Sequence, residues 1–217
     1  MNFALASILS LSVGITAVIG LARFRKIEPD FYPFVVLIWL GLLNEVISIS
    51  LVYAGVPNAA NSNIFIVLES MLLMWQFYQW QLFEKRPFMF CVITLILLLF
   101  WIVFTFFFST IHVFNSYFII FRAFIITLAS IAMINKLITT ERDVLLKNSI
   151  FIICMGMILF YTFSALVEIF WIYGLDKSYL FRTHIYEIVC YINVLSNLIY
   201  ALAILWMPKK HQFTLLF

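Results

Sequence analysis

The chain contains 217 residues, of which 65% are hydrophobic and 11% are charged, and its formal net charge at pH 7 is +3. Soluble domains carry about 25% charged residues, so this composition excludes a soluble enzyme or a soluble binding domain. We therefore expect an all-α integral membrane protein that forms a single transmembrane domain over residues 1–217, in contact with the lipid bilayer and without a nucleic-acid partner.

Apolar segments of about 18 residues or more, the length that a bilayer-spanning helix requires, recur along the whole chain. The predicted spans cover residues 3–22, 32–54, 63–83, 88–108, 112–134, 148–173 and 184–207. Basic residues follow the first span rather than precede it, unlike the arrangement in a cleavable signal peptide, so we expect this span to be retained. Because the connections between the spans are short, the sequence predicts a seven-transmembrane-helix bundle.

The basic residues of the loops are distributed unevenly between the two ends of the predicted bundle. One end carries Arg23, Arg25, Lys26, Lys85, Arg86, Lys136, Arg142, Lys147, Lys209 and Lys210. The loops at the other end carry Lys177 and Arg182. Since loops rich in lysine and arginine stay in the cytoplasm, this distribution predicts an outside N-terminus and a cytoplasmic C-terminus in the cytoplasmic membrane.

The span over residues 88–108 differs from the others because Thr94 and Thr105 are its only clearly polar residues. A helix without a polar face gains nothing from the interior of a polar bundle, so we expect this span at the lipid-exposed edge. The span over residues 3–22 instead aligns small residues for close helix packing. These residues are Ser7, Ser10, Gly14 and Ala17.

Polar side chains form a stripe on each of the other five spans, within an arc of about 120° or less. Each ionised residue at mid-membrane costs ~2.5 to 3.5 kcal/mol, so these stripes are expected to face the bundle interior. Together they predict one polar cluster. Its members are Asn44, Glu45, Glu69, Gln76, Asn115, Arg122, Tyr161, Glu168, His184, Glu187 and Asn193.

The charges of this cluster are unbalanced, because four glutamates, Glu45, Glu69, Glu168 and Glu187, accompany one deep basic residue, Arg122. At 1.5 Å of rise per residue, all five lie roughly 5 to 15 Å below the outer ends of their spans. We expect Arg122 to form an ion pair with Glu45, Glu69 or Glu168. The remaining acids either stay protonated or meet a cation, which can be a metal, an organic amine or a transported ion.

His184 and Glu187 are three residues apart and can share one face of a helix. Carboxylate metal sites in helix bundles combine such a pair with glutamates from facing helices. The predicted ligands of a divalent metal ion are therefore Glu69, Glu168, His184 and Glu187. The residues identify no other cofactor. No retinal Schiff base is expected, because residues 184–206 contain no lysine.

These patterns favour a receptor-like or sensory protein that binds a small cationic or amphipathic ligand, or a metal ion, in an outward-facing acidic pocket. Such a protein would signal to a membrane or cytoplasmic partner through helix movement. Two alternatives stay open: a cation- or proton-coupled transporter of small solutes, and a metal-dependent intramembrane enzyme acting on lipid. A further interpretation is that the acids only join helices through ion pairs and hydrogen bonds.

Overall fold

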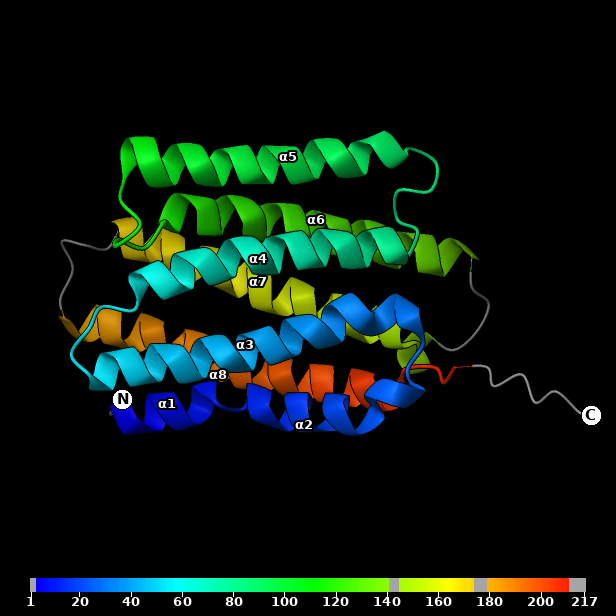
Figure 1. The fold of residues 1–217 in the computed structure, drawn as a ribbon, viewed down its shortest axis with the longest axis horizontal. Coiled ribbons are helices and arrows are strands. Elements are labelled where there is room, and N and C mark those ends of the chain that lie inside the picture. Colours follow the sequence, from blue (N-terminus) through cyan, green and yellow to red (C-terminus); the bar gives the residue numbers. More distant parts are fainter. Residues whose placement is uncertain (1–2, 141–144, 174–178, 211–217) are drawn as a thin grey trace, which may run out of the picture.

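A computed structural model of the chain describes the backbone of residues 3–140, 145–173 and 179–210. Within these ranges all regular elements are helices and none is a strand. The helices longer than one or two turns are α1 (Phe3–Ser10), α2 (Val13–Arg23), α3 (Tyr32–Tyr53), α4 (Ala59–Gln79), α5 (Pro87–Val103), α6 (Ser116–Thr140), α7 (Ser149–Tyr173) and α8 (Tyr179–Trp206). Figure 1 shows them lying side by side along one common direction.

Six helical segments in the described part of the chain are long and apolar enough to cross a membrane. They are Ala4–Lys26, Pro29–Tyr53, Pro87–Phe108, Ser116–Thr140, Ser149–Tyr173 and Glu187–Trp206. The chain is therefore a helical membrane protein. The third predicted span, residues 63–83, corresponds to α4, which has 21 residues but is more polar and is not one of these six segments.

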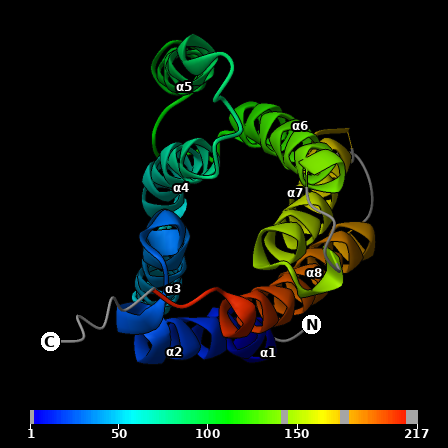
Figure 2. The same ribbon diagram turned by 90° about the vertical axis from the view of Figure 1, so that its right-hand side faces the viewer.

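The helices form a ring when the bundle is viewed along its length (Figure 2). In this view α2, α3, α4, α6, α7 and α8 surround a common centre, and α5 lies outside the ring against α4 and α6. Leu97 is the one buried residue of α5. The predicted edge position of the span over residues 88–108 is thus confirmed, because a helix that is apolar all round can face lipid on most of its surface.

The first predicted span, residues 3–22, is not one continuous helix but is interrupted between α1 and α2. At the interruption the Ser12 amide donates to the Leu9 carbonyl at 3.1 Å, which is the tighter i→i−3 pattern of a 3₁₀ turn. Asn197 of α8 donates its side-chain amide to Ser12 Oγ at 2.9 Å, and Thr16 Oγ1 donates to the Asn197 carbonyl at 2.8 Å. A hydrophobic pattern could not predict this turn because its cause lies on α8.

Other helix ends also differ from the predicted spans. Helix α4 occupies Ala59–Gln79 instead of residues 63–83, and α6 continues to Thr140 beyond the predicted end at residue 134. Helix α8 begins at Tyr179 rather than at residue 184. The physical reason is that hydropathy marks where a segment enters the bilayer, whereas a helix ends where its backbone hydrogen bonds are capped.

Four loop segments that carry basic residues meet at the end of the bundle near the C-terminus (Figure 1). Lys136 donates its ammonium group to the Gln81 carbonyl at 2.7 Å, which joins the end of α6 to the loop before α5. The Lys210 amide donates to the Lys26 carbonyl at 2.9 Å. Arg23 donates to backbone carbonyls at the end of α8. The alternation of basic and non-basic loops along the sequence thus corresponds to the two ends of the structure.

Candidate functional site

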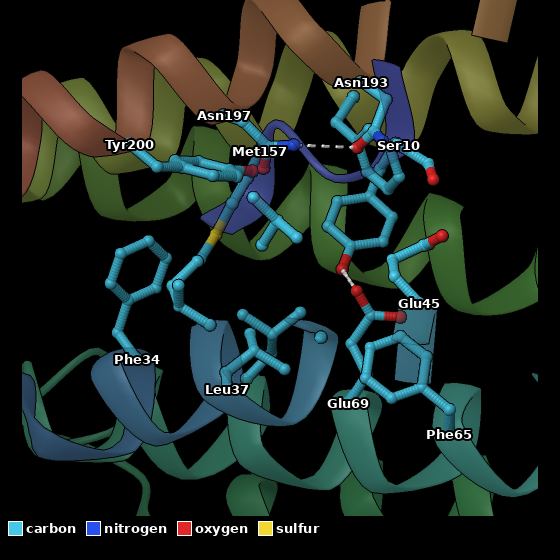
Figure 3. A pocket seen from close by; sticks show the side chains of 16 residues that line it. Ser10, Phe34, Leu37, Glu45, Phe65, Glu69, Met157, Asn193, Asn197 and Tyr200 are labelled. Atoms are coloured by element: carbon cyan, nitrogen blue, oxygen red, sulfur yellow. Dashed lines mark hydrogen bonds between the residues drawn. The ribbon is translucent and has the colours of Figure 1, made fainter. Parts of the chain in front are cut away.

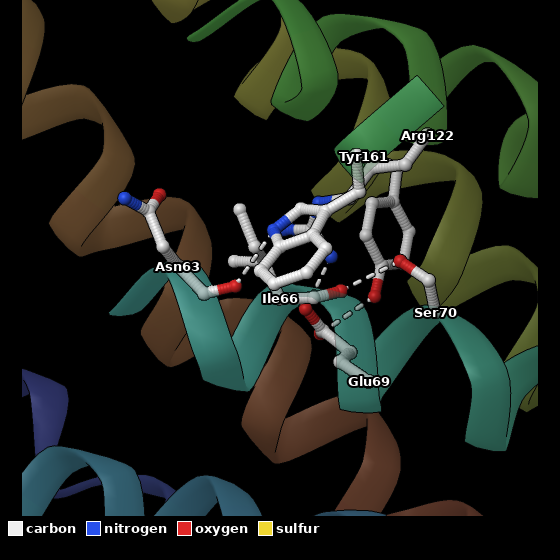
Figure 4. A network of polar contacts seen from close by, with 7 residues as sticks. Asn63, Ile66, Glu69, Ser70, Arg122 and Tyr161 are labelled. Carbon is white, nitrogen blue, oxygen red and sulfur yellow. Dashed lines mark hydrogen bonds and ion pairs between the residues drawn. The ribbon is translucent and has the colours of Figure 1, made fainter. Parts of the chain in front are cut away.

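A buried ion pair joins α4 to α6 near the middle of the bundle. The Arg122 guanidinium, on a residue that is 4% exposed, donates from Nη1 to Oε2 of Glu69. The Tyr161 hydroxyl of α7 donates to the other carboxylate oxygen, Oε1, at 2.7 Å. Figure 4 shows the three side chains converging from their helices. The expectation that Arg122 pairs with one of three glutamates is confirmed, with Glu69 as the partner.

The ring of Tyr161 also lies against the guanidinium, with the Arg122 Cζ atom 5.4 Å from the ring centroid. A cation over an aromatic face gains up to about 2 kcal/mol when water is excluded. Glu69 therefore has its charge balanced by Arg122 and both oxygens engaged by protein donors. These contacts connect α4 to both α6 and α7 through buried side chains.

A cavity of about 110 Å³ lies beside this ion pair, in the centre of the bundle. Helices α3, α4, α7 and α8 form most of its wall, and the turn between α1 and α2 completes it. Its lining residues include Ser10, Val13, Phe34, Leu37, Gly41, Glu45, Phe65, Glu69, Leu73, Met157, Tyr161, Asn193, Asn197 and Tyr200. Figure 3 shows Glu45, Glu69, Ser10 and Asn193 toward one end and Phe34, Leu37 and Tyr200 toward the other.

The two glutamates of the cavity wall differ in their electrostatic partners. Ion pairs between described residues join Arg122 to Glu69, Lys136 to Glu84, and His184 to Glu187. Within the described part of the chain, Glu45 thus lines the cavity without a basic ion-pair partner. The cavity wall carries a formal negative charge that the protein balances at Glu69 but not at Glu45.

Four of the residues predicted for the polar cluster line this cavity: Glu45, Glu69, Tyr161 and Asn193. Arg122 does not line the cavity itself but contacts Glu69, which does. The sequence prediction therefore brought together residues from α3, α4, α6, α7 and α8 that do meet in space.

Gln76 is fully buried but caps a helix instead of lining the cavity. Its side-chain oxygen accepts the Phe34 amide of the first turn of α3 at 2.7 Å, and its Nε2 donates to the Asp30 carbonyl. The first amides of a helix have no partner within the helix, so Gln76 satisfies one that would otherwise be orphaned. The interpretation of Gln76 as part of a ligand path is not supported by this geometry.

Two predicted asparagines also have local structural partners. Asn115 accepts the Phe118 amide at 3.1 Å and donates to Thr105 Oγ1 at 3.0 Å, which fixes the start of α6 beside the end of α5. Asn44 accepts from the Asn61 side chain at 2.8 Å, across the contact between α3 and α4. Neither residue lines the cavity.

The residues predicted to bind a metal do not come together. His184 Nδ1 lies 3.2 Å from Glu187 Oε2 within α8, and the His184 side chain is 72% exposed. Glu168 lies about two turns beyond Tyr161 on α7, roughly 10 Å along the helix, and hydrogen-bonds to Ser116. No three His, Cys, Asp or Glu side chains among the described residues form a metal-ligand group. The predicted metal site is thus corrected, because Glu69 is held at mid-bundle by Arg122 while the His184 pair is near the start of α8.

Sequence reasoning missed Asn63 as an organising residue. This fully buried side chain donates to the carbonyls of Ile111 and Val113 at 2.9 and 2.7 Å, and accepts the Asn115 amide at 3.2 Å. It thereby shapes the connection between α5 and α6. The available signal was the i, i+7 spacing of Asn63 and Ser70, which places both on the buried face of α4.

Asn197 is not among the residues predicted for the polar cluster. The structure places it on the cavity wall, where it also donates to Ser12 at the interruption between α1 and α2. Its spacing from Asn193, one helical turn, was the signal in the sequence. Ser10, expected only to assist packing, lines the same cavity.

Comparison with known proteins gives no relative for this arrangement: no protein-family model, curated protein or solved structure matches the chain. The fold and the site define the class as a helical membrane bundle in which a buried ion pair borders a small central cavity.

Proposed function

We propose that the chain is a receptor-like or sensory protein of the cytoplasmic membrane that binds a small cationic ligand in the central cavity. The observation behind this proposal is that Glu45 lines the cavity without a basic partner among the described residues, while Glu69 is balanced by Arg122. A carboxylate inside a membrane protein is costly unless it is paired. A cationic ligand supplies the missing positive charge.

The empty space next to Glu45 supports ligand binding over a purely structural role for the acids. Protein interiors are close-packed and contain few voids larger than a water molecule. A cavity of about 110 Å³ with a carboxylate in its wall departs from that rule. Glu45 hydrogen-bonds to Ser10 of α1, but unlike Glu69 it has no basic partner among the described residues.

The orientation in the membrane is part of the proposal. The basic segments that contain Arg23, Lys85, Lys136 and Lys209 lie at one end of the bundle, and by the positive-inside rule this end faces the cytoplasm. The N-terminus is then outside. A ligand-induced helix movement would be transmitted to a membrane or cytoplasmic partner at these basic loops. Arg142 and Lys177, which also entered the prediction, lie outside the described residues.

A cation- or proton-coupled carrier is the second candidate, and the interruption between α1 and α2 favours it. Ser10 and Val13, on either side of the interruption, both line the cavity. Secondary transporters commonly build their substrate sites from discontinuous helices near the middle of the membrane. Proteoliposomes that take up labelled butylamine faster than protein-free liposomes would favour the carrier, because the uncharged amine crosses a bilayer unaided, and binding without this excess uptake would favour the receptor.

Thermal unfolding of the detergent-solubilised full chain tests ligand binding. Butylamine hydrochloride and divalent chloride salts are added to the wild type and to Glu45→Gln, because binding to the folded state raises the melting temperature. The matched control is Glu84→Gln, whose side chain is 67% exposed in a loop. We expect a cation to stabilise the wild type and the control but not Glu45→Gln. If no cation raises the melting temperature of the wild type more than that of Glu45→Gln, the acids have only a structural role.

A further inference from the structure

The cavity has two chemically different ends, and this division indicates a particular class of ligand. Figure 3 shows Ser10, Glu45 and Asn193 grouped apart from Phe34 and Tyr200. We infer that the ligand is a primary monoamine with a short apolar tail, bound with its ammonium group beside Glu45 and its tail beside Phe34 and Tyr200. This inference rests on the proposed function and specifies the ligand of the same site.

The polar end presents hydrogen-bond acceptors, as an ammonium group requires. Glu69 is already engaged on both oxygens by Arg122 and Tyr161, which leaves Glu45 as the carboxylate available to the ligand. The side-chain oxygen of Asn193 accepts a long hydrogen bond from Asn197 at 3.3 Å and retains a second lone pair. A primary ammonium has three N–H donors to satisfy such acceptors, whereas a quaternary ammonium has none.

The opposite end is apolar and tightly packed around the cavity. The rings of Phe34 and Tyr200 meet edge to face at 5.3 Å between centroids, and Phe34, Leu73 and Met157 are each at most 1% exposed. The Tyr200 hydroxyl is a polar group at this end, but no acidic side chain of the cavity lining lies there, so a second ammonium group would lose its hydration without gaining a counter-ion. The ligand therefore has one charge, which excludes diamines and hydrated metal ions as good occupants.

The volume limits the length of the tail. An engineered apolar cavity of about 150 Å³ binds benzene, which has six heavy atoms, so a cavity of about 110 Å³ has room for a ligand of about four to six heavy atoms. Beyond the ammonium group, this leaves room for a tail of roughly three to five carbon atoms. Up to that length each buried CH₂ strengthens binding about fourfold, the equivalent of ~0.8 kcal/mol.

The experiment measures dissociation constants of the full chain in detergent for methylamine, propylamine, butylamine, pentylamine and heptylamine. We expect affinity to rise about fourfold per carbon to butylamine or pentylamine and then to stop rising. At equal concentration, 1,4-diaminobutane and butyltrimethylammonium should bind at least tenfold more weakly than butylamine. A diamine or quaternary amine that binds as well as butylamine would overturn the inference.

Variants of the apolar end make the size argument independent of the amine series. Leu37→Ala removes part of the cavity wall and enlarges the cavity, so the preferred alkyl tail of the amine should lengthen by about two carbons. Met133→Leu, a volume-conserving change at a buried position of α6 outside the cavity, should leave the preference unchanged. If Leu37→Ala does not fold, Leu37→Val should lengthen the preferred tail by about one carbon.

The outcomes separate the two levels of the proposal. Amines that bind with equal affinity whatever their tail, and only when Glu45 is present, contradict the inference and leave the proposed function standing. Amines that bind equally to the wild type and to Glu45→Gln, or to neither, contradict the proposed function itself.

Discussion

Two glutamates on neighbouring helices line the same cavity, yet their surroundings differ. Glu69 on α4 faces α6 and α7, which supply Arg122 and the Tyr161 hydroxyl. Glu45 on α3 lines the cavity with Asn193 of α8 and the turn between α1 and α2. One acid is thus paired with a basic residue, whereas the other hydrogen-bonds to Ser10 and lines the cavity without a basic partner among the described residues. The comparison indicates that the facing helices decide whether an intramembrane acid meets a basic partner.

The largest effect is expected from breaking the pair at Glu69. Arg122→Ala leaves a buried carboxylate without its cation and should lower the free energy of unfolding by about 3 to 5 kcal/mol. Arg25→Ala, which removes an exposed arginine from the short 3₁₀ helix after α2, should change it by less than about 0.5 kcal/mol. Thermal unfolding of both variants in one detergent is the measurement, and equal melting temperatures would contradict the stabilising role of the pair.

A second variant disturbs the end of the cavity formed by Phe34 and Tyr200, without changing a charge. A Cβ at Gly156 would lie 2.6 Å from Tyr200 Cε1, so Gly156→Ala forces α7 and α8 apart and should cost about 1 to 3 kcal/mol. The matched control is Gly14→Ala, whose Cβ would meet Leu42 at 3.8 Å, an ordinary contact. We expect Gly156→Ala also to weaken butylamine binding, because Tyr200 lines the cavity. Unchanged stability of Gly156→Ala would mean that Tyr200 moves freely.

A third variant tests whether a polar residue of α4 outside the cavity acts on structure alone. Gln76→Ala leaves the buried Phe34 amide without an acceptor and should cost about 1 to 2 kcal/mol. Gln79→Ala, at a half-buried position on the same helix, serves as the control and should have a smaller effect. The relative response to butylamine should be the same in both variants. Loss of amine binding in Gln76→Ala at retained stability would place Gln76 in the ligand site after all.

The smallest effect on the unliganded protein is expected at Glu45 itself. Glu45→Gln removes no ion pair between described residues and keeps the side-chain shape, so unfolding free energy should change by less than about 1 kcal/mol. Glu69→Gln, the same chemical change on the neighbouring helix, should cost about 3 kcal/mol or more because it strands Arg122. A similar loss of unfolding free energy in the two variants would contradict the proposed difference between Glu45 and Glu69.

Several features of the site could be predicted because they depend on single residues. Arg122 was the one basic residue far from every span end, so an acidic partner was required wherever the bundle placed it. The edge position of α5 followed in the same way from its lack of a polar face. The predicted metal ligands failed because the spacing of His184 and Glu187 describes one helix, whereas a metal site needs a third ligand from another.

By itself, the sequence determined which segments leave water and which faces of the helices are polar, because transfer free energy and the helical period are local properties. Only the tertiary structure decided what each polar face meets. Glu69 and Gln76 lie on nearly the same face of α4, about two turns and roughly 10 Å apart. At one depth that face meets Arg122 and the cavity, and at the other it meets the unpaired amides at the start of α3. A periodic pattern specifies a direction but not the partner found at each depth.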